Sequence, residues 1–240
     1  MISPYGYEKV KYFFSKLFAG DWQSIVSVLS CRLHMEEICY LMCRSGGPMP
    51  ENDCSSNALT IQMLAGTELT GIFDRVEKIS LQERLWFDRR RRLIKYGIGR
   101  CYVTFNPAGL PCHFQWVFDC NDNEKLKNLF KGEYPRIGPE EILLEHALTL
   151  RPYQGNRVHS AARSKVIALE ERNNGIRQFK SFINVQNVPA MRTARNLGFV
   201  PVMIRRERWH LFCHSFVFEK YDGDEAAPLH PRSARQQSVR

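Results

Sequence analysis

Residues 150–160 join a predicted strand to a predicted helix and carry the residue types of an anion-binding loop. Gly155 has no side chain, so the backbone can approach a ligand closely there. The first amides of a helix have no helical acceptors and lie at the positive end of the helix dipole, which favours phosphate groups. Arg151, Arg157 and His159 add basic side chains. The segment predicts a pyrophosphate site, and the alternative is a plain connection with solvated arginines.

Two carboxylates lie in the strand predicted over 141–150, just upstream of this loop. Because side chains alternate along a strand, Glu141 and Glu145 are expected on one face, and His146 on the opposite face. A carboxylate in a partly desolvated cleft can have a pKa near neutral, which suits a general base. Glu141 and Glu145 are therefore alternative candidates for a base, and the competing interpretation is that Glu141 merely begins the strand at the surface.

A helix-start pattern follows downstream of the loop. Asn187 is a favourable N-cap residue, Pro189 falls in the first turn of the expected helix, and Gly198 comes just past its end. The pattern predicts a short helix that leads into a strand beginning at Phe199.

The spacing of apolar residues predicts the elements that must position these side chains. Strands are expected at 58–64, 101–105, 113–118, 141–150, 176–183, 199–204 and 209–218, with the charged residues 205–208 as the turn between the last two. Helices are expected at 7–18, 22–42, 67–96, 124–130 and 160–172, and after Asn187. This order predicts an α/β sandwich with a mixed sheet, preceded by a helical N-terminal extension over 1–50 and followed by a disordered tail over 221–240.

Composition narrows the class of protein. The 240 residues are 44% hydrophobic, which excludes a mainly disordered chain, and the glycines and prolines are aperiodic, which excludes a collagen-like one. No apolar stretch approaches the ~20 residues of a membrane-spanning helix, and the first residues do not resemble a signal peptide, so a cytoplasmic location with reduced cysteines is expected. The net charge of +9 favours an acidic partner: nucleic acid, an acidic carrier protein or a phosphorylated cofactor.

Taken together, these motifs resemble the GNAT superfamily of N-acyltransferases. The loop from Gln154 to His159 matches the family's Gln/Arg-x-x-Gly-x-Gly/Ala loop after its fourth strand, Asn187 matches an asparagine after the fifth strand, and Leu197-Gly198-Phe199 matches the entry to the sixth. The resemblance covers residues 57–220. It implies a mixed, mostly antiparallel central sheet flanked by helices.

The resemblance also implies an activity, the transfer of an acetyl or longer acyl group from acyl-CoA, usually acetyl-CoA, to a small-molecule amine by direct attack in a ternary complex. Glu141 or Glu145 would deprotonate the amine, and a backbone amide near Thr149 or Leu150 would stabilise the oxyanion. The residues implied in cofactor binding are Leu150, Gln154, Gly155, Asn156, Arg157, Val158, His159, Ser160 and Asn187.

The chain departs from the family pattern at three positions. Arg157 and His159 replace the two small residues of the loop, and Ala194 stands where the family often has a tyrosine that acts as general acid, with Tyr153 a distant substitute. Two alternatives therefore stay open: a long-chain N-acyl amino acid synthase that uses an acidic acyl-carrier protein, and a non-catalytic binding module of the same fold.

Two further groups of residues favour no additional function. The run Arg89–Arg92 is a candidate patch for nucleic acid or a carrier protein, but aromatic residues are not interleaved with it, so no nucleic-acid binding is expected. His34, Cys39 and Cys43 lack the paired spacing of metal ligands, so no metal is expected.

Overall fold

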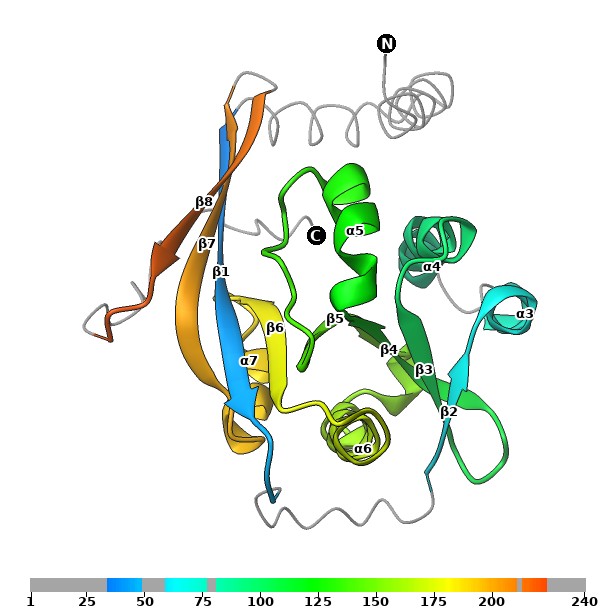
Figure 1. The fold of residues 1–240 in the computed structure, drawn as a ribbon. Helices are drawn as coiled ribbons and strands as arrows, with labels where there is room; N and C mark the ends of the chain where they lie inside the picture. The colour runs from blue at the N-terminus through cyan, green and yellow to red at the C-terminus, as the bar shows by residue number, and fades with distance from the viewer. Residues whose placement is uncertain (1–33, 49–58, 77–80, 211–212, 224–240) are drawn as a thin grey trace, which may run out of the picture.

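The computed structural model describes residues 34–48, 59–76, 81–210 and 213–223, and these build one sheet with helices on both faces (Figure 1). The strands are β1 (His34–Ser45), β2 (Thr60–Leu64), β3 (Arg100–Phe105), β4 (Pro111–Phe118), β5 (Glu141–Thr149), β6 (Gln178–Asn184), β7 (Val200–His210) and β8 (Cys213–Lys220). The helices are α3 (Gly66–Val76), α4 (Leu81–Lys95), α5 (Asn123–Phe130), α6 (Val158–Asn174) and α7 (Val188–Asn196), with short 3-10 turns η1 (Cys120–Asp122) and η2 (Arg151–Tyr153).

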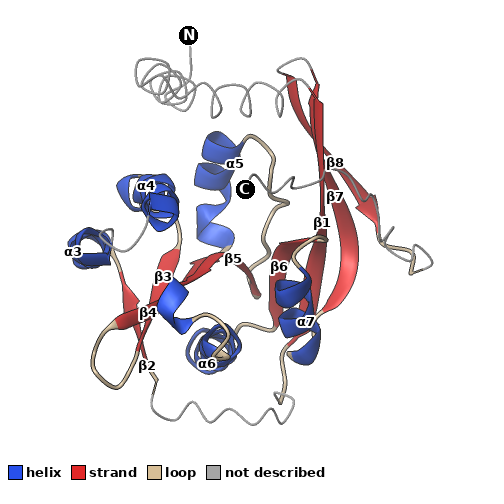
Figure 2. Cartoon of the chain, turned by 180° about the vertical axis from the view of Figure 1, so that it is seen from behind, coloured by secondary structure: helices blue, strands red, loops and turns tan. Residues whose placement is uncertain are grey.

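The eight strands lie in the order β2-β3-β4-β5-β6-β1-β7-β8. Each neighbouring pair is antiparallel except β5 and β6, which are parallel. Helices α3, α4 and α5 cover one face of the sheet, and α6 and α7 cover the other (Figure 2). The expected mixed, mostly antiparallel sheet flanked by helices is confirmed.

The expected helix over 22–42 is wrong in its described part, because His34–Ser45 is a strand inserted between β6 and β7. Tyr40 and Met42 pack toward α6 and α7, whereas Leu41 packs toward α3 and α4. A strand buried on both faces has a continuous apolar run, and over this length such a run can be mistaken for the apolar stripe of a helix. The sheet therefore uses chain that precedes residue 57, and the helices expected over residues 1–33 lie outside the described residues.

The expected turn over 205–208 is also wrong, because β7 continues to His210. The guanidinium of Arg205 is buried over the Phe182 ring, 4.5 Å from its centroid, and donates to the Glu133 carbonyl oxygen at 3.1 Å. Arg208 instead donates to Glu36 of β1 at 3.0 Å. Charged side chains of residues 205–208 thus find partners both in the interior and on the surface of the sheet. The segment can therefore continue as a strand despite its charge.

The remaining described elements agree with the sequence prediction within a few residues. The six described cysteines are free. No helix within the described ranges is long and apolar enough to cross a bilayer. The tail expected over 221–240 lies outside the described residues beyond residue 223.

Candidate functional site

Strands β5 and β6 separate after a short parallel contact. Three pairs join them, Glu141–Gln178, Ile142–Phe179 and Leu143–Lys180, and no pairing follows. At the point of separation, side chains replace the missing backbone bonds. Ser181 Oγ donates to the Leu144 carbonyl oxygen at 2.8 Å, and the Phe182 amide donates to Glu145 Oε1 at 2.6 Å. The two strands therefore form a V that opens toward the C-terminal end of β5.

A β-bulge lies in the open part of β5. Phe114 of β4 faces Leu148 and Trp116 faces Glu145, so two residues of β5 oppose one residue of β4. The bulged residue His146 has a φ of 54°, a left-handed conformation that is uncommon for a residue with a side chain.

The bulge changes which face each side chain occupies. Leu143 and Leu148 both pack toward α3 and α4, although their numbers differ in parity. Thr149 lies on the α6 face, where its hydroxyl is 2.9 Å from His113 Nδ1. The His146 ring packs 5.6 Å from Phe118 on the α4 and α5 face. The expectation that odd residues share one face up to Thr149, with His146 opposite, is therefore wrong beyond the bulge.

The structure separates the two candidate bases. Burial raises the pKa of Glu145 to about 7, against the opposing effects of the Phe182 amide and the Arg205 guanidinium. Glu141 lies at the closed end of the V, 2.6 Å from Lys180 Nζ, and accepts the Gly138 amide at 2.8 Å. Although burial acts in the opposite direction, these contacts hold the pKa of Glu141 below its usual value. Of the two carboxylates, Glu145 has the environment of a base.

A second carboxylate with a raised pKa, which the sequence analysis missed, lies beyond Glu145. Burial raises the pKa of Glu133 to about 7, although the Arg205 guanidinium lowers it. Glu133 and Tyr134 come from the connection between α5 and β5, and the Tyr134 ring packs 6.4 Å from His146. These polar groups lie on the α4 and α5 face of the V. A connecting loop has no periodic pattern of apolar residues, so the sequence does not predict which face of the sheet its side chains reach.

The predicted anion-binding loop has the expected backbone. Gly155 has a φ of 81°, and a Cβ atom built on it would meet no atom within 4 Å. The Gln154 side chain donates to the Thr149 carbonyl oxygen at 2.9 Å and ties the loop to the end of β5. Arg157 is the N-cap of α6, with a φ of 57° and no capping hydrogen bond from its side chain.

The first amides of α6 precede its helical hydrogen bonds. The bond from the Ala161 amide to the Arg157 carbonyl, at 3.1 Å, is the first of the ladder, so the amides of Val158, His159 and Ser160 have no helical acceptor. Asn156 and Arg157 are exposed beside them. Such an N-terminus suits a phosphate group.

Two other predicted residues use their polar groups within the fold. The Leu150 amide donates to the Cys112 carbonyl oxygen at 3.0 Å, so in this arrangement it cannot also stabilise an oxyanion. The Asn187 side chain accepts the Ala190 amide at 3.2 Å, which confirms it as the N-cap of α7. Its predicted contact with the donor remains a prediction.

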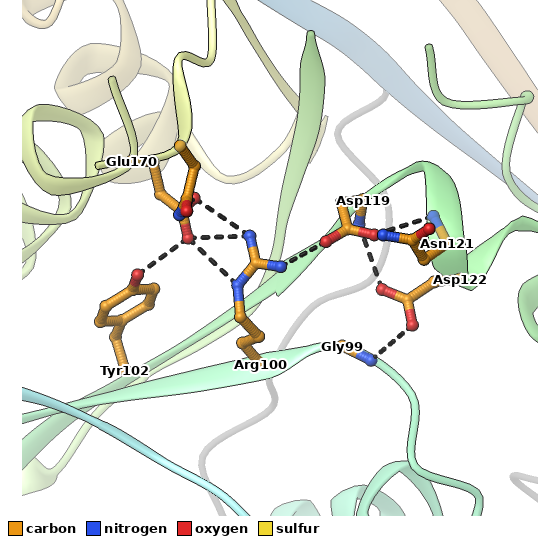
Figure 3. Close-up of polar contacts among 8 residues, drawn as sticks. Gly99, Arg100, Tyr102, Asp119, Asn121, Asp122 and Glu170 are labelled. Atoms are coloured by element: carbon orange, nitrogen blue, oxygen red, sulfur yellow. Dashed lines mark hydrogen bonds and ion pairs between the residues drawn. The ribbon is translucent and has the colours of Figure 1, made fainter. Parts of the chain in front are cut away.

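The C-terminal half of α6 is fixed to the sheet by a buried carboxylate (Figure 3). Glu170 is fully buried and accepts hydrogen bonds from Arg100 Nη2 at 2.9 Å and from the Tyr102 hydroxyl at 2.8 Å. Arg100 also pairs with Asp119. The network holds α6 against β3, and thereby positions its N-terminus at the opening of the V.

A buried arginine lies two turns earlier on the same helix, and the sequence analysis missed it. Arg163 is 3% exposed, and its guanidinium lies over the Phe199 ring, 4.8 Å from the centroid. Near it, the His113 and His159 rings lie 5.1 Å apart, and burial lowers the pKa of His159 to about 3. The sequence does contain a signal for this buried arginine, since Arg163 lies among the core positions Ala162 and Val166 of the helix.

At the position where the resemblance implies a tyrosine, Ala194 lies buried in α7, and its methyl side chain has no proton to donate. The Tyr153 hydroxyl accepts a hydrogen bond from Asn106 at 3.2 Å, outside the V. The arginine run of α4 also has internal roles: Arg90 lies 2.9 Å from His146 Nδ1, and Arg91 pairs with Asp74 at 2.6 Å. Within the described ranges, no three His, Cys, Asp or Glu side chains gather as metal ligands would.

Comparison with known proteins gives a match of fold. No protein-family model and no curated protein sequence matches the chain. The GCN5-related glucosamine N-acetyltransferase region of a fungal multi-domain β-N-acetylglucosaminidase superposes with a TM-score of 0.52 at 9% identity, over 77% of this chain and 22% of that one.

Two bacterial structures have lower TM-scores. A GNAT-family acetyltransferase from Colwellia psychrerythraea gives a TM-score of 0.49 at 12% identity, over 79% of this chain and 60% of its own. A GCN5-related N-acetyltransferase from Sphaerobacter thermophilus gives 0.46 at 12% identity, over 78% of this chain and 57% of its own. The chain thus spans less than two thirds of each of these three proteins. With the sheet order, the splayed β5 and β6 and the loop before α6 in view, the chain has the fold of the GCN5-related N-acetyltransferases.

Proposed function

We propose that this chain is an N-acyltransferase that moves an acetyl or longer acyl group from acyl-CoA to an amine by direct attack in a ternary complex. The observation that supports this most strongly is the V between β5 and β6, which is paired over only three residues and has the uncapped N-terminus of α6 at its opening. The pyrophosphate of the donor would bind the amides of Val158 to Ser160. The thioester arm would enter the V, where the two strands no longer pair with each other.

The chemical step assigns a role to Glu145. The carboxylate takes a proton from the ammonium form of the acceptor, and the free amine then attacks the thioester carbonyl carbon. A C–N bond forms as the C–S bond breaks, and CoA leaves as the thiolate. The attacking nitrogen passes its second proton through water to this thiolate as the amide forms, and Glu145 releases the first proton to solvent when the base is regenerated. A pKa near 7 suits this base, because the carboxylate is then substantially deprotonated at neutral pH and still basic enough to accept the proton.

A thiolate is a good leaving group, so a side chain that protonates it is not essential. The buried Ala194 is therefore compatible with turnover. Arg90 and Arg91 contact His146 and Asp74, so the described contacts of these two arginines do not favour a docking patch for an acyl-carrier protein.

The proposal is tested by titrating the full chain with CoA and acetyl-CoA in a calorimeter, with Gly155→Asp and Gly155→Asn as a matched pair. Both side chains tolerate the left-handed backbone and have open space around them, so the pair differs mainly in charge. We expect Asp to weaken binding about tenfold more than Asn, because its carboxylate opposes the phosphates. Equal affinities for the two variants, or no binding of CoA to the wild-type chain, would contradict the proposal.

A non-catalytic binding module is the alternative outcome. Release of free CoA thiol from acetyl-CoA in the presence of a panel of amines separates the two functions. Binding without any Glu145-dependent thiol release would favour the binding module.

A further inference from the structure

Arg163 carries a positive charge into the interior of the fold, where part of its guanidinium lacks hydrogen-bond acceptors. Its side chain is 3% exposed, and neither Nε nor Nη2 has a hydrogen-bond acceptor among the described residues. Burial lowers the pKa of Arg163 to about 10, so the guanidinium is still charged at neutral pH. A buried charge without a partner is costly, and native proteins rarely keep one that nothing pairs with.

The geometry of the unpaired atoms defines the missing partner. The guanidinium carbon lies over the Phe199 ring, 4.8 Å from its centroid, and this contact supplies no acceptor for the Nε and Nη2 hydrogens. Nε and Nη2 point in the same direction and form the two-pronged edge that matches the two oxygens of a carboxylate. A neutral carbonyl, such as those in the CoA arm, would accept one bond without neutralising the charge.

The position of Arg163 decides which reactant carries the carboxylate. Arg163 lies on α6, whose N-terminus is the proposed donor site, and helical side chains lean toward the N-terminus. Burial, with the charge of Arg163, also lowers the pKa of His113, whose Nε2 is buried and lacks a partner in the described part of the chain. The groups suited to the acceptor, Glu133 and His146, lie on the opposite face of the sheet.

The depth of Arg163 points to the acyl end of the donor. Its charge and that of Glu145, at the point where the V begins to open, act on each other, whereas Asn156 and Arg157, beside the amides that suit the phosphates, are exposed at the opening. The phosphates would therefore stay at the surface, and the part of the donor that reaches the depth of Arg163 is the acyl group.

We propose that Arg163 binds a carboxylate at the far end of the donor's acyl group, so that the chain uses a dicarboxylic acyl-CoA, such as succinyl-CoA, in preference to an unsubstituted one. This inference rests on the proposed function. The carboxylate takes no part in the bond changes: the amine still attacks the thioester carbonyl, and CoA still leaves as the thiolate.

The test compares succinyl-CoA with butyryl-CoA, which has the same number of acyl carbons and no carboxylate. Calorimetry on the full wild-type chain is expected to show about 30-fold tighter binding of succinyl-CoA, or ~2 kcal/mol at 1.4 kcal/mol per tenfold. In Arg163→Met the ratio should fall to about 1, and Arg163→Lys, which keeps the charge and loses the fork, should give an intermediate ratio. Arg157→Met is the matched control, because an exposed arginine beside the phosphates affects both donors and leaves the ratio unchanged.

Each outcome is decisive. Equal affinity for the two donors in the wild type, or a preference that persists in Arg163→Met, overturns the inference while the proposed function stands. Free succinate that binds beside CoA as tightly as the succinyl group does would overturn the assignment of the carboxylate to the donor. If CoA and all its thioesters fail to bind, the proposed function itself fails.

Discussion

The unit formed by β5 and α6 has two ends, and they differ in whether their charged side chains have hydrogen-bond partners. At the closed end, where β5 pairs with β6, Glu141 bonds to Lys180, and the buried Glu170 is bonded by Arg100 and Tyr102. At the open end, Arg163 is equally buried, and its Nε and Nη2 have no partner within the described chain.

The difference separates groups that hold the fold from groups that are available to a ligand. A buried ion pair with complete hydrogen bonds fixes one arrangement of helix and sheet, and breaking it exposes the remaining charge to an apolar interior. A buried charge left without a partner weakens the fold until a ligand supplies one. The same helix therefore has a structural end and a functional end.

The largest effect is expected for the base at the open end. Glu145→Gln should lower the rate of acyl transfer about 10²- to 10⁴-fold, the usual range for loss of a general base. In the wild type the rate should rise as the pH passes through about 7, where Glu145 loses its proton, and this rise should be absent from the variant. Initial rates of thiol release between pH 5 and 9 measure both quantities.

Glu141→Gln is the matched control, because it makes the same change on the same strand at the closed end. Its carboxylate has a lowered pKa and bonds Lys180, so we expect a loss of stability with the pH profile of the rate retained. A variant of Glu141 that loses the pH-dependent rise, with Glu145→Gln unaffected, would reverse the assignment of the base.

The next largest effect is expected at the closed end. Glu170→Gln should lower the free energy of unfolding by about 3–5 kcal/mol, because Arg100 and Tyr102 lose the charged acceptor between them. Urea denaturation followed by circular dichroism measures this loss. A change below ~1 kcal/mol would mean that the network in Figure 3 does not hold α6 in place.

Local sequence predicts part of this arrangement. Gly155, between a predicted strand and a predicted helix, indicates the loop before α6, and Asn187 with Pro189 indicates the start of α7. These features depend on residues close together in the chain. What sequence reasoning missed depends on distant contacts. β1 is a strand because β6 and β7 pair with both of its edges, and no local pattern records that.

The bulge in β5 shows the same limit within the site. A strict two-residue alternation placed His146 on the wrong face, because one extra residue in β5 reverses the parity of everything after it. Arg163 was missed because a single charged residue among apolar helix positions is usually assigned to the solvent. Its guanidinium packs over Phe199, which lies 36 positions away in the sequence.

A smaller effect on stability is expected from the proton that Glu145 holds. The folded-state pKa of about 7 lies above the unfolded value near 4.5, so its stabilising contribution is complete below about pH 4.5 and is lost as the pH rises through 7. Three histidines, His113, His146 and His159, have pKa values lowered by desolvation and act in the opposite direction below about pH 6.5.

The difference in unfolding free energy between the wild type and Glu145→Gln reports the titration of the carboxylate alone, because the histidines are the same in both. Relative to the wild type, the variant should gain on the order of 2 kcal/mol of unfolding free energy between pH 5 and pH 8. Urea titrations at four pH values measure it. A difference that does not change with pH would show that Glu145 titrates in the folded chain as it does in the unfolded one.

The unpartnered charge at the open end predicts a change of opposite sign to that of Glu170. Arg163→Met should leave the free energy of unfolding unchanged or raise it by about 1 kcal/mol, because an apolar side chain of similar length replaces a buried charge that has no acceptor. Loss of the contact with Phe199 limits the gain. Urea denaturation of Arg163→Met and Glu170→Gln measures both changes in the free energy of unfolding. A comparable loss in the two variants would contradict the distinction between the two ends of α6.

The smallest effect is expected at the N-cap of α6. Arg157 has a left-handed backbone, so Arg157→Gly relieves strain of about 1 kcal/mol, but the greater freedom of glycine in the unfolded chain costs about the same. The free energy of unfolding should therefore change by less than ~0.5 kcal/mol, while the affinity for CoA falls about threefold at low salt because a positive charge beside the phosphates is lost. Calorimetry in low and high salt measures both the fall and its screening. Tighter binding of CoA to the glycine variant would mean instead that the Arg157 side chain crowds the phosphates, and that the open end is shaped by steric fit more than by charge.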